Sequence, residues 1–160
     1  MRFYTGQHVH YCGIDLHARS LYLCILNQAG EVLAHKKLPC DREELLRALR
    51  PYCKDLVVSV ECVFCWYWIA DLCVEQGYTF VLGHALAMKA IHGGKTKNDR
   101  IDSLKIASLL RGGNLPQARA SKPLTQKIHQ HAWRRYAAYV PGFIQRPVRR
   151  SRETRAALNT

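Results

Sequence analysis

The sequence predicts an α/β fold built around a mixed sheet, and three observations support this prediction. Residues 11–39 contain three β-rich segments separated by short turns, which is typical of a meander. Residues 55–62, DLVVSVEC, form a Val-rich segment that is apolar enough to be buried on both faces of a sheet. Helical and strand-like segments then alternate, as expected around parallel strands. The 160 residues suffice for one domain with a sizeable core.

The meander consists of three predicted strands. The first is short and apolar and runs from Tyr11 to Leu16, and the second, SLYLCILNQ, alternates and is rich in residues that favour strands. NQAG forms a turn in which Gly30 supplies a permissive backbone, and EVLAHKKLP returns as the third strand. The short connections make the three strands antiparallel.

Helices follow the meander and enclose the remaining strands. The first begins at Asp41, a good N-cap residue, has acidic residues in its first turn and ends at Pro51. The second, VFCWYWIADLCVEQG, turns Trp68 and Leu72 inward and ends at Gly77. The segments after it are a strand, YTFVLGH, a short helix, ALAMKAIH, and a last helix, NDRIDSLKIASLLR, which a Gly-Gly pair stops.

The composition predicts a soluble, cytoplasmic protein. Hydrophobic residues make up 48% of the chain, no apolar run reaches the roughly 18 residues that span a bilayer, and the first residues lack the apolar core of a secretory signal. Seven cysteines, several within apolar runs, favour reduced and buried thiols over a disulfide framework. Cys62 and Cys65 form a C-x-x-C, but no second ligand pair lies at zinc-site spacing, so a structural zinc is the lesser alternative.

The net charge of +12 is unevenly distributed and predicts two regions. Residues 1–118 carry 14 Lys and Arg against 11 Asp and Glu, which gives +3, and predict one α/β domain. Residues 119–160 carry 10 basic residues against one acid, which gives +9. Their apolar spacing is irregular, and the last segment, residues 141–160, contains two prolines. This basic tail is predicted to be disordered or translated out of frame; if it were a selected segment, it would indicate a polyanionic partner such as nucleic acid.

Four acids lie inside or against apolar segments: Asp15, Glu61, Asp99 and Asp102. If the strands that carry Asp15 and Glu61 are adjacent and parallel, these two residues are neighbours, and the spacing of Asp99 and Asp102 places both on one helix face. Such a cluster repels itself unless cations are present, and oxygen ligands select Mg²⁺ or Mn²⁺. The alternatives are that Asp99 is simply an N-cap and that Asp15 and Glu61 form ion pairs with a Lys or Arg such as Arg100.

Three segments closely resemble the N-terminal domain of the DEDD insertion-sequence transposases, a family that includes the Piv-type DNA invertases. They are GIDLH, VSVEC and GGKTKNDRIDSLKIASLLRGGNLPQA, and the resemblance covers about residues 9–118. Its specific part is the K-T-x-x-D-R-x-D block followed by A-x-L-L-R-x-G-x-L-P. The resemblance implies an RNase H-like fold similar to the RuvC Holliday-junction resolvase, in a protein of the bacterial cytoplasm.

The resemblance maps a catalytic, metal-binding tetrad onto Asp15, Glu61, Asp99 and Asp102, which would bind Mg²⁺ or Mn²⁺ beside DNA. This agrees with the interpretation of the four acids from their positions alone.

The resemblance also implies partners. Lys95, Lys97 and Arg100 become candidates for contacts with DNA phosphates, with a solvated basic loop as the alternative. DNA is the expected substrate, the best studied family members are guided by a bridge RNA, and full-length members are expected to form homo-oligomers.

The chain departs from the family pattern after LPQA. Family members continue with an Arg-rich helical segment and a second domain that supplies a serine nucleophile, whereas residues 119–160 do not match that continuation. We therefore expect a truncated or frameshifted copy that does not recombine DNA alone. Two other functions stay open: a stand-alone metal nuclease similar to resolvases, and a non-enzymatic remnant that binds DNA or RNA.

Overall fold

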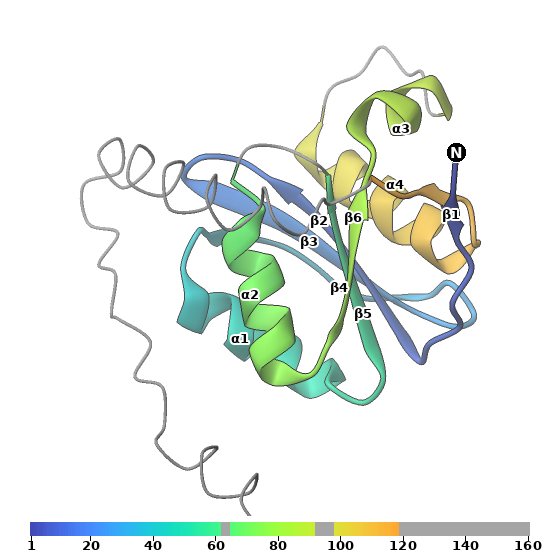
Figure 1. Ribbon diagram of the computed structural model, residues 1–160. Helices are drawn as coiled ribbons and strands as arrows, with labels where there is room; N and C mark the ends of the chain where they lie inside the picture. Colours follow the sequence, from blue (N-terminus) through green and yellow to red (C-terminus); the bar gives the residue numbers. More distant parts are fainter. Residues whose placement is uncertain (62–64, 92–97, 119–160) are drawn as a thin grey trace, which may run out of the picture.

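The computed structural model describes residues 1–61, 65–91 and 98–118 (Figure 1). Lys95 and Lys97, Cys62 of the C-x-x-C, and the whole of residues 119–160 lie outside the described residues. The domain boundary at residue 118 therefore stays a prediction.

One five-stranded mixed sheet, in the order β4-β3-β2-β5-β6, forms the centre of the molecule. The meander strands β2 (His10–Leu16), β3 (Ser20–Asn27) and β4 (Val32–Pro39) are antiparallel to one another. Two strands, β5 (Leu56–Glu61) and β6 (Thr79–Gly83), extend the sheet in parallel with β2. This order confirms the predicted α/β fold around a mixed sheet with a β-meander.

Helices cover both faces of the sheet (Figure 1). Helices α1 (Arg42–Leu49) and α2 (Tyr67–Gln76) pack on one face, and α4 (Asp99–Arg111) crosses the other. A short 3₁₀ turn (Arg50–Tyr52) follows α1, and α3 (Ala85–Ile91) follows β6. Among the described residues, no helix is both long and apolar enough to cross a membrane.

The alternation of side chains along β2 and β5 assigns their residues to two cores. Ile14, Val58 and Val60 belong to the core under α1 and α2, whereas Tyr11 and Val57 belong to the core under α4. Because side chains alternate along a strand, the odd-numbered residues of both strands face α4. β5 is buried along its length except at its last residue, as its Val-rich sequence predicts.

The helix ends follow the sequence with one exception. Asp41 caps α1 by accepting a 3.0 Å hydrogen bond from the Glu44 N–H, and Gly77 ends α2 with a φ of 71°, as predicted. The alternative that Asp99 is the N-cap of the last helix is wrong. Asn98 takes that position, with an extended backbone, and its side chain accepts a hydrogen bond from the Arg100 N–H.

A small second sheet was not predicted. β1 (Phe3–Tyr4) pairs antiparallel with β7 (Leu115–Pro116) and ties the start of the chain to the segment after α4. Six cysteines are free in the described chain and five of them are buried, which confirms the prediction of buried thiols for this part.

Candidate metal centre

The ends of β2 and β5 bring two acids side by side. The strands are adjacent and parallel, and their register pairs Ile14 with Val60, so that Asp15 and Glu61 come next on both strands. This is the neighbouring arrangement expected from the sequence. Both side chains lie on the face of the sheet that α4 covers.

A glycine in β2 lets α4 come close to these strand ends. Gly13 and Ser59 are partners in the register of β2 and β5, one step before the two acids. A Cβ on Gly13 would lie 2.4 Å from the backbone nitrogen of Ala107 and 2.5 Å from the carbonyl oxygen of Ser103. The backbone of α4 therefore rests directly on the backbone of β2, an approach that only glycine permits.

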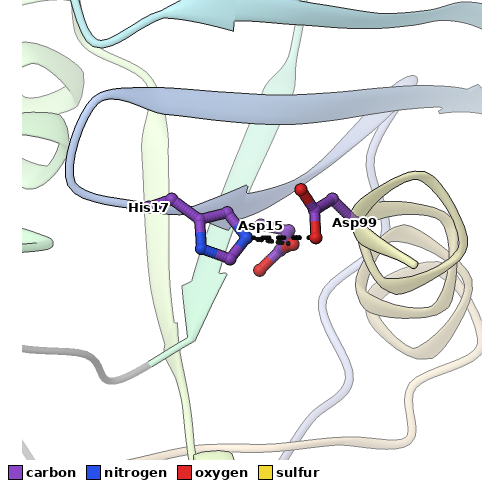
Figure 2. Close-up of side chains that lie close together, drawn as sticks. All are labelled: Asp15, His17 and Asp99. Carbon is purple, nitrogen blue, oxygen red and sulfur yellow. Dashed lines mark hydrogen bonds and ion pairs between the residues drawn. The ribbon is translucent and has the colours of Figure 1, made fainter. Parts of the chain in front are cut away.

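Three side chains converge where the first turn of α4 meets the end of β2 (Figure 2). His17 Nε2 lies 3.0 Å from Asp15 Oδ2 and 3.3 Å from Asp99 Oδ1. One ligand atom from each residue lies within 4.8 Å of those of the other two. The Asp15 side chain is 14% exposed, whereas His17 and Asp99 are each 43% exposed, so the cluster is open to solvent on one side.

Neighbouring acids raise the pKa values of Asp15 and Glu61. Burial raises the pKa of Asp15, the negative charges of Asp99 and Asp102 raise it further, and His17 opposes the shift. Burial also raises the pKa of Glu61, followed by the charge of Asp15, while Lys89 opposes it. The structure thus brings Asp15 and Asp99 into one contact cluster, with the other two acids close enough to act electrostatically.

Asp102 and Arg100 lie beside this cluster in α4. Asp102 forms an ion pair with Lys105, at 3.4 Å, one helical turn further on. Arg100 is exposed, and within the described part of the chain no ion pair joins it to Asp15 or Glu61, so the alternative pairing with Arg100 is not observed there. The carbonyl of Arg100 accepts a 2.8 Å hydrogen bond from His35 Nε2 of β4, which holds the first turn of α4 against the meander.

His17 is the member of the cluster that lies outside the four predicted acids. A signal was present, because His17 follows Asp15 by two residues and strand periodicity places both on the same side. His17 comes just after the strand, however, and its closeness to Asp99 depends on where α4 crosses.

The donor set fits a divalent cation. Two carboxylates and one imidazole nitrogen converge, and two further carboxylates contribute negative charge nearby. Burial and, to a smaller extent, neighbouring negative charge raise the pKa values of Asp15 and Glu61 and so disfavour their charged forms. A bound cation would offset that negative charge. Carboxylate oxygens are ligands for Mg²⁺ and Mn²⁺, and imidazole is a ligand for transition-metal ions.

Comparison with known proteins finds a matching family and similar solved structures. The profile of the family DEDD_Tnp_IS110, described as "Transposase", matches residues 12–158 and so extends beyond the described part of the chain. RuvC from T. thermophilus in complex with a Holliday junction substrate aligns at 15% identity over 69% of this chain and 100% of that chain, with a TM-score of 0.46. A second Thermus thermophilus RuvC structure aligns at 16% identity over 81% and 95%, with a TM-score of 0.43. The search of curated proteins found no match.

Proposed function

This chain belongs to the DEDD_Tnp_IS110 family of transposases, and on that premise we propose that it carries the metal-dependent phosphodiester-cleaving centre of a DNA transposase. Asp15, Glu61, Asp99 and Asp102 are its proposed catalytic acids. The observation that supports this proposal most directly is the convergence of Asp15 from β2 and Asp99 from α4 on a single point.

The carboxylates would hold Mg²⁺ or Mn²⁺. Cations bound beside a scissile phosphate activate water and stabilise the leaving oxygen. Asp15 and Asp99 offer ligand atoms from two different elements, which fixes their separation by the packing of α4 on the sheet. Glu61, at the end of β5, adds a third carboxylate from the sheet. Asp102 adds the fourth, with its charge partly offset by Lys105.

Basic residues at the start of α4 are proposed to contact the DNA backbone. Arg100 is exposed in the first turn of α4, next to Asp99. Lys95 and Lys97 precede it in the sequence and belong to the same proposal. Such contacts depend on charge and weaken steeply with added salt.

Strand transfer is proposed to need more than this centre. The resemblance implies a serine nucleophile from a second domain, so we propose that strand exchange requires that serine in addition to the cation-binding acids. A guide RNA and a homo-oligomer, both implied by the same resemblance, remain part of this proposal.

The test measures cation binding by the purified chain. Wild type is expected to gain thermal stability with Mg²⁺ or Mn²⁺, by about 2.7 kcal/mol at one hundred times the dissociation constant. Asp15→Asn and Asp99→Asn should each abolish that gain. Glu43→Gln is the matched control, because it removes an exposed carboxylate from α1 on the opposite face of the sheet and should leave the gain intact.

The same preparations are then incubated with branched and linear DNA. Cation-dependent cleavage that Asp15→Asn abolishes would support a catalytic centre. Binding that weakens with salt but persists in all acid variants, without cleavage, would instead favour a nucleic-acid-binding protein. A wild-type chain that no divalent cation stabilises would contradict the proposal.

A further inference from the structure

We infer that His17 is a ligand of this centre and that its nitrogen makes the site prefer Mn²⁺ and related transition-metal ions to Mg²⁺. The inference rests on the proposed function. It extends the proposed site by adding a nitrogen ligand to the carboxylate oxygens and by specifying which ions the site prefers. It concerns a residue that the four-acid pattern of the sequence does not include.

The distances around His17 Nε2 are those of neighbouring ligands on one ion. Two ligand atoms at right angles, each about 2.1 Å from a metal ion in octahedral geometry, lie about 3.0 Å apart. The observed separations are 3.0 Å to Asp15 Oδ2 and 3.3 Å to Asp99 Oδ1. The three ligand atoms lie within 4.8 Å of one another, so side-chain adjustments suffice to bring them toward one ion.

The backbone of His17 is held in place for this role. Its N–H donates a 2.9 Å hydrogen bond to the carbonyl of Ser20, which closes the turn between β2 and β3. Its carbonyl accepts a 3.2 Å hydrogen bond from the buried thiol of Cys40. The ring projects toward Asp15 (Figure 2) from a backbone that is already fixed, so little backbone entropy is lost when an ion binds.

The chemistry of imidazole sets the selectivity. Mg²⁺ is a small, hard ion that takes oxygen ligands and gives up its waters reluctantly. Imidazole nitrogen suits transition-metal ions better, and affinity for a given mixed site rises from Mn²⁺ along the first transition row. Replacing His17 should therefore weaken Mn²⁺ binding much more than Mg²⁺ binding.

A purely ion-pairing role of His17 predicts a different change in cation affinity. If His17 were only an ion-pair partner of Asp15 and Asp99, it would compete with a cation for the two carboxylates. Its removal would then leave the affinity for both ions unchanged or increased. The sign of the change therefore separates the two roles.

The experiment uses the full 160-residue chain and titrates Mn²⁺ by the electron paramagnetic resonance signal of the free ion, with Mg²⁺ measured by competition. Variants are His17→Ala, His17→Gln, Asp15→Asn, and His10→Ala as a control that removes a histidine from the other end of β2. His17→Ala is expected to lower Mn²⁺ affinity about 10-fold to 100-fold, the range seen when groups that support a metal site are removed. Mg²⁺ affinity should fall less than about 3-fold. His17→Gln keeps a polar side chain at this position and serves as a second variant should His17→Ala fail to fold.

A spectroscopic measurement identifies the ligand directly. In protein labelled with ¹⁵N-histidine, pulsed electron paramagnetic resonance of bound Mn²⁺ should show a coupling between the ion and an imidazole nitrogen in wild type and in His10→Ala. The coupling should be absent in His17→Ala. Unchanged or tighter Mn²⁺ binding in His17→Ala, or no coupling in wild type, would overturn the inference. If Asp15→Asn still abolishes binding in that case, the proposed function survives; if wild type binds no cation, both fail.

Discussion

The replacement Gly13→Ala tests whether the packing of α4 on β2 assembles the centre. The added methyl group would lie 2.4 Å from the backbone nitrogen of Ala107 and 2.5 Å from the carbonyl of Ser103. Both atoms belong to the backbone of α4, so a change of side-chain rotamer cannot relieve the clash. The helix itself must move away from the sheet.

The size of the effect follows from these distances. Ordinary contacts of a Cβ begin at 3.4 Å, so relief requires a shift of about 1 Å at this point of the helix. Overpacking of this kind costs about 1–3 kcal/mol, against a gain of about 0.5–1 kcal/mol from replacing glycine within a strand. We expect a net loss of roughly 1–2 kcal/mol in the free energy of unfolding. Asp99 would move with the helix, beyond the roughly 0.5 Å tolerance of an organised metal site.

The assay combines urea denaturation with cation titration. Gly13→Ala should lower the denaturation midpoint and weaken Mn²⁺ binding by about 10-fold or more. Gly77→Ala is the matched control: its φ of 71° makes alanine unfavourable there, but nothing lies within 4 Å of the added methyl group, and α2 is on the opposite face. It should lose comparable stability, about 1–2 kcal/mol, with unchanged cation affinity. Wild-type stability and affinity in Gly13→Ala would refute the reasoning.

Three further predictions concern individual side chains. Burial raises the pKa values of Asp15 and Glu61 in the folded protein above their ordinary values of 3.8 and 4.5. Without cations, the contribution of these groups to the free energy of unfolding is therefore complete below the ordinary pKa values. It is lost as the pH rises through the raised pKa values of the folded protein. Asp15→Asn should therefore raise the free energy of unfolding at pH 7, by about 0.5–2 kcal/mol, in thermal unfolding with a chelator; a loss of stability there would contradict this. Asn98→Ala and Asp41→Ala each remove an N-cap and should each lower the free energy of unfolding by about 1 kcal/mol. In cation titrations only Asn98→Ala should bind more weakly, because it loosens the first turn of α4, which carries Asp99. His35→Ala should cost about 1 kcal/mol and weaken cation binding without touching a ligand, and unchanged binding would show that its hydrogen bond does not position α4.

The sequence predicts most of the fold because its signals are local. Alternation along the meander, the Val-rich β5 and the caps at Asp41 and Gly77 each depend on residues close together in the chain. The short β1–β7 sheet escaped prediction because each strand has two residues and the partners are more than 100 positions apart. The N-cap of α4 was ambiguous because Asn98 and Asp99 are both good cap residues, and only the extended backbone at Asn98 decides between them.

The candidate site was predictable to the extent that it follows strand ends. Acids at the ends of two strands can be placed side by side once the strands are taken as parallel neighbours, and this accounts for Asp15 and Glu61. The closeness of His17 to Asp99 is of another kind, because it depends on the point at which α4 crosses β2. That point is set by the contact at Gly13, which no periodicity of the sequence reveals.

The two faces of β2 and β5 differ in a way that stability alone does not explain. The face toward α1 and α2 carries Ile14 and Val60, which are fully buried and apolar. On the face toward α4, the register places Gly13 opposite Ser59, and the two acids follow.

Each of these choices on the α4 face carries a cost. Gly13 contributes no side chain to the core, and the buried Ser59 Oγ has no hydrogen-bond partner in the described part of the chain. The acids are disfavoured in their charged form. Gly13 lets the backbone of α4 come close to β2, and this packing carries Asp99 toward Asp15. Gly13 thus sets the distance between the elements that supply the ligands, so substitutions at Gly13 or at the acids should both alter cation binding.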